Sequence, residues 1–195
     1  MRPSDHFLAS PSPWVTRFLR LIPQPGPVLD LACGRGRHVR LLRANNYHVI
    51  AVDRDIEGLA AFSDDDDVEI VAADLEGPGP EERASWPLAN RSFGGIVVTN
   101  YLHRPLFSSM IAALSPNGVL IYETFAAGNQ RYGKPSNPDF LLRTGELLEA
   151  FCPALQIVAY EHGKIAGPRP RVVQRICAIK TSPGAEKAKA VARIG

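Results

Sequence analysis

The sequence predicts an α/β fold with a mainly parallel sheet and helices on both faces. Short apolar segments typical of strands alternate with segments of helical spacing along most of the 195 residues. A glycine turn, Gly34-Arg35-Gly36, stands between the first strand and the first helix of this alternation. The last two apolar segments are joined without room for a helix, which predicts an antiparallel hairpin at one edge of the sheet.

The N-terminal part of the chain begins with a proline-rich segment. We expect residues 1–13 to be irregular, followed by a short helix over Trp14–Ile22 that ends before Pro23. The strands expected next are Val28–Leu31, Tyr47–Val52 and Val68–Ala72, and the helices between them are Gly36–Asn45 and Ile56–Phe62.

The remaining part continues the alternation after a proline-rich loop at 75–93. The expected strands are Gly95–Thr99, Val119–Glu123, Gln156–Glu161 and Val172–Ile179, and the expected helices are Pro105–Leu114 and Thr144–Phe151. Residues 125–140 form a long polar connection, which is either a lid over a site or a disordered insertion. We expect one domain over 14–180 and a flexible tail over 181–195.

Composition excludes several classes of protein. Apolar residues make up 45% of the chain and charged residues 22%, as in ordinary globular domains. A net charge of +2 without a basic stripe argues against a nucleic-acid partner, and we expect neither a membrane span nor a signal peptide. The three cysteines are scattered without metal-ligand spacing, which indicates reduced thiols and a cytoplasmic location. The run Asp64–Asp67 is typical of a solvated turn and does not indicate a metal site. A monomer and a homodimer are both compatible with the sequence.

The glycine turn predicts close approach of a nucleotide-like ligand to the backbone. Glycine tolerates positive φ and has no Cβ to obstruct the ligand. A dinucleotide site requires Gly-x-Gly-x-x-Gly, but Val39 occupies the third glycine position here. The turn therefore fits NAD poorly, and an ordinary strand–helix turn remains the structural alternative.

Polar residues lie at or just past the ends of the expected parallel strands. Ligands of open α/β sheets bind beyond the carboxyl ends of the strands. These residues are Asp30, Asp53, Asp74, Asn100 and Glu123. Their common position predicts a binding site at this rim, although strand-ending Asp and Asn residues also serve as caps and turn formers.

The pattern Asp30-x-Ala32-x-Gly34-x-Gly36 resembles the first motif of class I methyltransferases that depend on S-adenosylmethionine (SAM), with Ala32 in place of its first glycine. The resemblance implies a Rossmann-like class I methyltransferase fold, with a seven-stranded, mainly parallel sheet and a reversed edge strand. It also implies SAM as the cofactor. The later stretches Tyr122–Asn129 and Gly133–Leu148 resemble the tellurite-resistance (TehB-like) methyltransferase group.

This resemblance assigns expected roles around the cofactor. The cofactor-binding residues expected are Asp30, Ala32, Gly34, Gly36, Arg37, Asp53, Arg54, Asp74, Leu75 and Asn100. Asp53 would accept hydrogen bonds from the ribose hydroxyls, Asp74 from the adenine amine, and Asn100 would approach the methionine part. Arg37 or Arg17 would hold the methionine carboxylate, and the sequence does not rank them.

The same resemblance implies an enzyme that methylates a small molecule, such as a thiol or a selenium or tellurium oxyanion. A soft nucleophile such as a thiolate or a selenide needs no general base. For an oxygen or nitrogen nucleophile the catalytic candidates are His103, Tyr101 and Glu123, with a capping or surface role as the alternative for His103. Alternative functions are methylation of RNA or protein, a catalytically silent SAM-binding regulator and, least favoured, hydride transfer with NAD.

Overall fold

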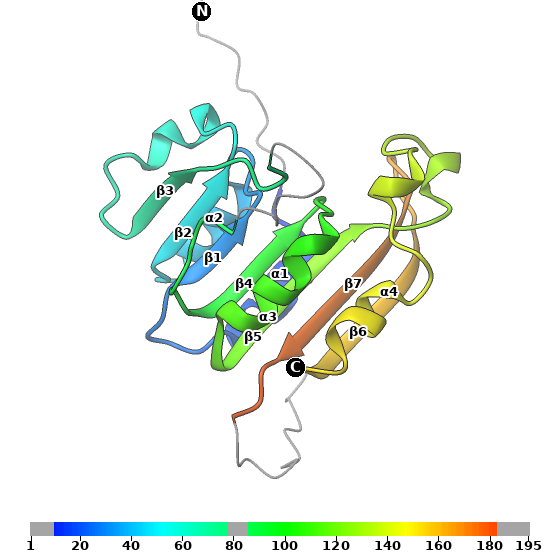
Figure 1. The fold of residues 1–195 in the computed structure, drawn as a ribbon. Helices are drawn as coiled ribbons and strands as arrows, with labels where there is room; N and C mark the ends of the chain where they lie inside the picture. The colour runs from blue at the N-terminus through cyan, green and yellow to red at the C-terminus, as the bar shows by residue number, and fades with distance from the viewer. Residues whose placement is uncertain (1–9, 78–85, 183–195) are drawn as a thin grey trace, which may run out of the picture.

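The computed structural model describes residues 10–77 and 86–182, so most of the expected N-terminal irregular segment and tail, and part of the 75–93 loop, lie outside the described residues. The described residues form a seven-stranded sheet with the order β3-β2-β1-β4-β5-β7-β6 (Figure 1). The strands are β1 (Val28–Leu31), β2 (Val49–Asp53), β3 (Val68–Ala72), β4 (Phe93–Thr99), β5 (Leu114–Phe125), β6 (Gln156–Ile165) and β7 (Arg171–Ile179).

The pairing of these strands confirms the predicted topology. Strands β1 to β5 run parallel to one another, whereas β7 is antiparallel to both β5 and β6. The reversed strand is therefore β7, one position inside the edge that β6 forms. The predicted hairpin accounts for this arrangement, because a short connection permits only an antiparallel return.

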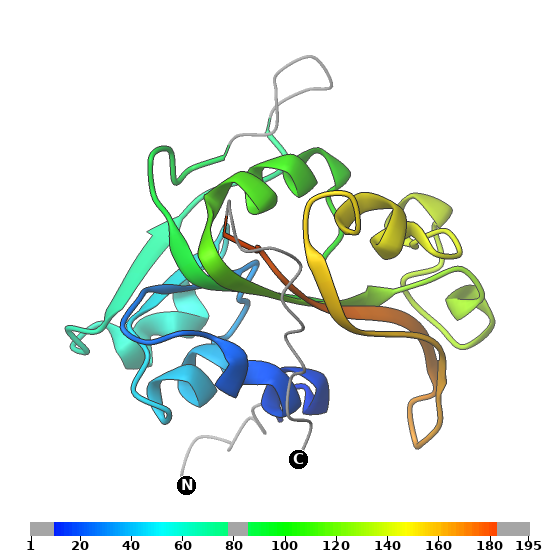
Figure 2. The same cartoon turned by 90° about the horizontal axis from the view of Figure 1, so that it is seen from below.

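Helices cover both faces of the sheet, as predicted. Figure 2 shows α1 and α2 on one face and α3 and α4 on the other. The α-helices are α1 (Pro13–Phe18), α2 (Arg37–Arg43), α3 (Phe107–Ala113) and α4 (Glu146–Phe151). Short 3₁₀ helices are η1 (Leu19–Leu21), η2 (Glu57–Phe62), η3 (Arg104–Leu106), η4 (Asn129–Arg131) and η5 (Pro138–Phe140).

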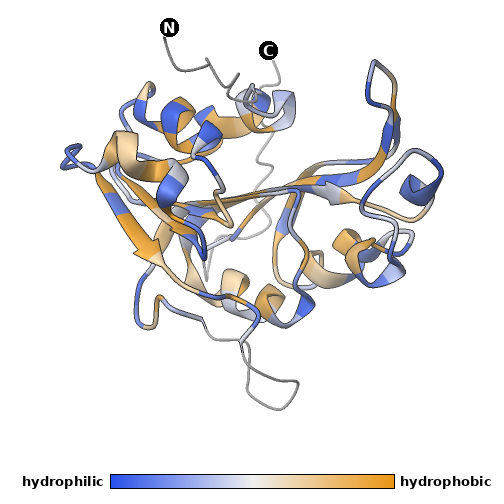
Figure 3. Ribbon diagram, turned by 90° about the horizontal axis from the view of Figure 1, so that it is seen from above, coloured by the Kyte–Doolittle hydropathy of each residue, from blue (hydrophilic) through white to orange (hydrophobic). Residues whose placement is uncertain are grey.

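Two apolar cores lie on opposite faces of the sheet, because side chains of a strand alternate between its faces. In β1, Val28 packs in the core beneath α1 and α2, whereas Leu29 and Leu31 pack in the core beneath α3 and α4. Each of these three side chains is fully buried, which stabilises the fold by about 1.5–3 kcal/mol per residue. Figure 3 shows the apolar residues concentrated in the sheet and the tip of the β6–β7 hairpin largely hydrophilic.

Element ends differ most from expectation around β5. The helix expected to reach Leu114 ends at Ala113, because Leu114 pairs with Phe93 of β4 beside an irregularity in the register. The stretch between β5 and α4 leaves the sheet and returns, and a bridge between Ala126 and Leu142 closes its base. We call residues 126–142 the rim segment. Among the described residues, no helix is long and apolar enough to cross a membrane.

Candidate functional site

Two cavities lie along the rim formed by the carboxyl ends of the parallel strands. The smaller, which we call the acidic cavity, has a volume of about 220 Å³ and is lined by Ala32, Asp53, Arg54, Asp74, Leu75 and Tyr101, with Glu76 beside them. The larger, which we call the basic cavity, has a volume of about 720 Å³ and is lined in part by Arg37, Asn100, Glu123, Lys134, Arg169 and Arg171. Asn100 and Tyr101 are neighbours in the chain but line different cavities, so the loop after β4 separates the two.

The glycine turn lies against the carboxylate that ends β2. The backbone N–H of Gly34 donates to Asp53 Oδ2 at 2.7 Å, and Asp53 Oδ1 accepts from the N–H of Asp55 at 3.0 Å. Gly34 and Gly36 have φ values of +56° and +72°, and Ala32 has +55° despite its side chain. Ala32 thus adopts the left-handed conformation that glycine favours, at a modest cost in strain.

The two glycines differ in what surrounds them. A Cβ on Gly36 would lie 2.7 Å from the Phe62 ring and 2.9 Å from Leu59, so this glycine is required for packing. A Cβ on Gly34 would meet no heavy atom of the described residues within 4 Å, so the space in front of this glycine is open to them. Gly34 therefore presents bare backbone toward this open space.

Asp30 does not enter either cavity, contrary to the expectation that its carboxylate points into the crevice. It lies on β1 one residue before the strand ends and shares the face of Val28, which α2 covers. The side chain is 1% exposed, and Oδ2 has no hydrogen-bond partner among the described residues. Burial raises the pKa of this carboxyl to about 7, against the opposing effect of the Arg37 guanidinium.

The structure separates the two arginines that the sequence left unranked. Arg37 extends from the first turn of α2 into the basic cavity, and its Nη2 donates to Thr99 Oγ1 at 3.1 Å. Arg17 lies instead 3.7 Å from Glu161 and stacks over Phe18. Of these two arginines, Arg37 is therefore the one at the rim.

Glu123 is held at the floor of the basic cavity by two partners. It is 2% exposed, accepts a hydrogen bond from Ser12 Oγ at 3.2 Å and pairs with Arg175 at 3.2 Å. The N–H of Ser12 donates in turn to His38 Nε2 at 3.0 Å. Burial and the nearby Arg37 lower the pKa of His38 to about 3, so its ring stays neutral and accepts this bond.

Comparison with known proteins decides the family. A methyltransferase domain family matches the chain over residues 5–144. The chain belongs to this methyltransferase family. Its members take SAM as methyl donor, so the predicted enzyme class and cofactor are confirmed. A search of curated protein sequences gave no match.

Solved methyltransferase structures confirm the class I fold. TehB from Haemophilus influenzae superposes with a TM-score of 0.68 at 17% identity, over 86% of this chain and 61% of that one. The N-methyltransferase NodS from Bradyrhizobium japonicum WM9 gives 0.62 at 16% identity, over 86% and 94% of the two chains. The glycopeptide N-methyltransferase MtfA, complexed with sinefungin, gives 0.59 at 16% identity, over 92% and 90%. This methyltransferase thus spans less than two thirds of the TehB chain, and these identities establish similarity of fold.

The catalytic candidates of this methyltransferase are not gathered at one point. Glu123 lines the basic cavity and Tyr101 the acidic one, whereas His103 is a lining residue of neither. The Tyr101 hydroxyl and His103 Nε2 are buried without a partner among the described residues, and burial raises the pKa of Tyr101. His103 precedes η3 but makes no capping hydrogen bond with its side chain. Asn100, with φ +57°, is exposed at the rim and does not cap this helix.

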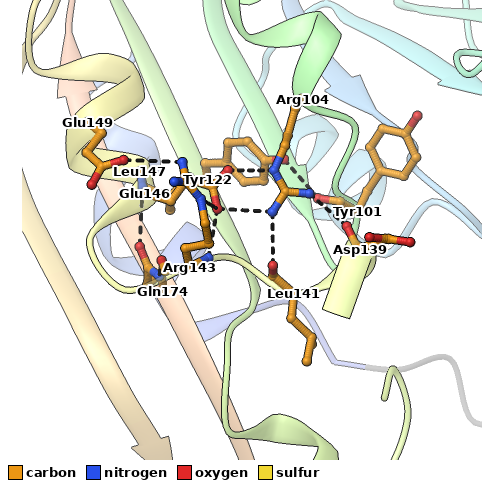
Figure 4. Close-up of polar contacts among 10 residues, drawn as sticks. All are labelled: Tyr101, Arg104, Tyr122, Asp139, Leu141, Arg143, Glu146, Leu147, Glu149 and Gln174. Atoms are coloured by element: carbon orange, nitrogen blue, oxygen red, sulfur yellow. Dashed lines mark hydrogen bonds and ion pairs between the residues drawn. The ribbon is translucent and has the colours of Figure 1, made fainter. Parts of the chain in front are cut away.

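A salt-bridge network fixes the rim segment to the loop after β4 (Figure 4). Arg104 Nε donates to Glu146 Oε1 at 2.5 Å, and its Nη atoms donate to the carbonyl oxygens of Asp139 and Leu141 at 2.8 and 3.0 Å. Glu146 is buried and also accepts from the N–H of Arg143 at 2.7 Å. The network therefore holds the C-terminal end of the rim segment, whose N-terminal half lines the basic cavity.

Sequence reasoning missed three residues of the basic cavity. Lys134 lies on the rim segment, Arg169 lies in the β6–β7 turn and Arg171 begins β7. The one signal in the sequence is the alternation Pro168-Arg169-Pro170-Arg171, which keeps cationic side chains at the tip of the hairpin. Only the pairing of β7 with β5 brings that tip to the rim.

Proposed function

We propose that this methyltransferase transfers the methyl group of SAM to a small-molecule acceptor held in the basic cavity, with the adenosine part of the cofactor in the acidic cavity. The observation that carries this proposal is the pair of cavities on either side of the loop after β4, both at the carboxyl ends of the parallel strands. This is where ligands of open α/β sheets bind.

The residues of the acidic cavity fit the adenosine part of SAM. Each Asp53 oxygen accepts one backbone hydrogen bond, and a carboxylate retains further lone pairs for the two ribose hydroxyls. Asp74 is exposed at the opening, where it can accept from the adenine amine, with Leu75 and Arg54 available beside the ring. The open face of Gly34 allows the cofactor to approach the turn.

The methionine part would lie toward the basic cavity. Arg37 would pair with its carboxylate, and Asn100 would contact it from the loop after β4. When bound, SAM supplies a methyl group already activated by the sulfonium charge. The protein therefore has to hold the acceptor in line and exclude water, more than to activate it.

Two segments of the chain form walls of the basic cavity that can hold an acceptor and exclude water. The segment Ser10–Pro13 closes one side, tied to Glu123 and His38, and the rim segment closes another through Asn129 and Tyr132. A thiolate or selenide acceptor needs no base here. For an oxygen or nitrogen acceptor, Glu123 is the catalytic candidate on the acceptor side and would take the proton on a carboxylate oxygen.

Transfer of labelled methyl groups tests this function. We expect radiolabelled SAM to label a thiol, selenite, tellurite or a small-molecule fraction of cell extract, and we expect Asp53→Ala to lose most of the activity. Label in the RNA or protein fraction alone would contradict the small-molecule acceptor. Tight SAM binding without transfer to any fraction would instead favour the regulatory alternative.

A further inference from the structure

The charge of the basic cavity differs from that of the rest of the rim. Among the described residues, four cationic side chains line it, Arg37, Lys134, Arg169 and Arg171, against the single carboxylate of Glu123. The described lining of the acidic cavity has the opposite balance, with three carboxylates and one guanidinium. The whole chain carries a net charge of only +2, so the excess in the basic cavity is a local feature.

These cations are not neutralised within the described residues. Glu123 is already paired with Arg175, which does not line the cavity. Within 10–77 and 86–182, no carboxylate lies within 4.0 Å of Lys134, Arg169 or Arg171. Burial lowers the pKa of the Arg37 guanidinium most, Glu123 and Asp30 raise it, and Arg171 is near enough to lower it by a smaller amount.

The cofactor would neutralise only part of this charge. Under the proposed function, Arg37 pairs with the methionine carboxylate, while the SAM sulfonium adds a positive charge of its own. Lys134, Arg169 and Arg171 are then left facing the acceptor. Like charges left together in a partly enclosed cavity are unfavourable, and an anionic ligand removes this repulsion.

We infer that the acceptor is a small organic acid whose carboxylate or similarly compact anionic group is bound by Arg169 and Arg171, with Lys134 at the rim. The inference rests on the proposed function and specifies its substrate class. A cavity of about 720 Å³ lies within the range that holds whole organic ligands, so it is larger than a bare inorganic oxyanion requires. Arginine favours planar carboxylates through paired N–H donors.

Matched thiol pairs test this inference by binding rather than by turnover. The protein is first saturated with S-adenosylhomocysteine (SAH), the demethylated product of SAM, which prevents reaction. Mercaptoacetate, 3-mercaptopropionate and 4-mercaptobutyrate, and the amide of each, are then titrated calorimetrically. We expect at least one carboxylate to bind roughly tenfold more tightly than its amide, with a preference that falls as ionic strength rises.

Variants show whether the hairpin arginines cause this preference. Arg169→Gln and Arg171→Gln should each weaken carboxylate binding several-fold, and the double variant should bind carboxylate and amide equally. Arg20→Gln is the matched control, because Arg20 is exposed and lines neither cavity. Unchanged SAH affinity in every variant shows that each one folds.

Three results would overturn the inference. They are equal or absent binding of carboxylate and amide in all three pairs, a preference that survives the double variant, and tighter binding of tellurite than of every organic carboxylate. Failure of the proposed function gives a different result. In that case the carboxylate preference remains, but labelled SAM transfers no methyl group.

Discussion

Replacing the two turn glycines by alanine, one at a time, should separate fold stability from cofactor binding. Both residues have positive φ, so each alanine introduces strain of about 1–2 kcal/mol. Only at Gly36 does the new methyl group also collide, with the Phe62 ring at 2.7 Å and Leu59 at 2.9 Å. Such overpacking costs a further 1–3 kcal/mol or so.

The expected losses of unfolding free energy are therefore about 1–2 kcal/mol for Gly34→Ala and about 2–5 kcal/mol for Gly36→Ala. Affinity for SAH should follow the opposite order. The methyl group at Gly34 projects into the open space that the cofactor would fill, so we expect at least a roughly tenfold weaker Kd from a single steric conflict.

Urea unfolding of the purified variants measures the loss of unfolding free energy, and calorimetric titration measures their affinity for SAH. Gly36→Ala should retain near-normal SAH affinity wherever it remains folded. Gly34→Ala binding SAH as tightly as the natural chain would refute the placement of the cofactor at this turn. Equal destabilisation of the two variants would refute the packing argument for Gly36.

Asp30→Asn and Arg104→Gln, with Arg143→Gln as a control, test the surroundings of the rim through stability. Folded Asp30 holds its proton up to about pH 7, whereas the carboxyl of the unfolded chain loses its proton near pH 3.8. The buried neutral carboxyl therefore stabilises the fold fully below pH 3.8. This contribution is lost as the pH rises from 3.8 through 7. Urea unfolding should show Asp30→Asn gaining roughly 4 kcal/mol on the natural chain between about pH 4 and pH 8, and a pH-independent difference would contradict the burial of Asp30. Arg104→Gln leaves buried Glu146 without its shortest ion pair and should cost about 2–3 kcal/mol, discounted because the Arg104 side chain is 37% exposed. Arg143→Gln, at a side chain 73% exposed, should cost less than about 1 kcal/mol, and equal losses would show that the Arg104 pair is not special.

The sequence predicted the strands well where burial alone determines them. Val28–Leu31 and Val68–Ala72 form β1 and β3 with the expected bounds, because apolar residues and nearby turn formers delimit them. The extension of β5 to Leu114 was not predictable, since it depends on pairing with Phe93 in another strand. Long-range pairing of this kind leaves little trace in local sequence.

The candidate site was predictable only where the position of a residue follows from the strand order. Residues at strand ends, such as Asp53 and Asn100, reach the rim through topology alone. The expected direction of the Asp30 side chain was wrong, because one step along a strand turns a side chain to the other face of the sheet, where a helix can cover it. Arg169 and Arg171 were missed because only the antiparallel return of β7 carries them to the rim. Their roles in binding remain predictions, as do those of the acidic cavity.

Calorimetric titration of SAH into the natural chain and into Asp53→Ala measures whether Asp53 of the acidic cavity holds the cofactor, with Asp55→Ala as a control at the neighbouring exposed carboxylate. Loss of two charge-assisted hydrogen bonds to the ribose is worth about 3 kcal/mol, so we expect micromolar binding by the natural chain and a Kd roughly a hundredfold weaker for Asp53→Ala. Asp55→Ala should change the Kd by less than about threefold. NAD binding without SAH binding would contradict SAM as the cofactor, and full SAH affinity in Asp53→Ala would contradict its position beside Asp53.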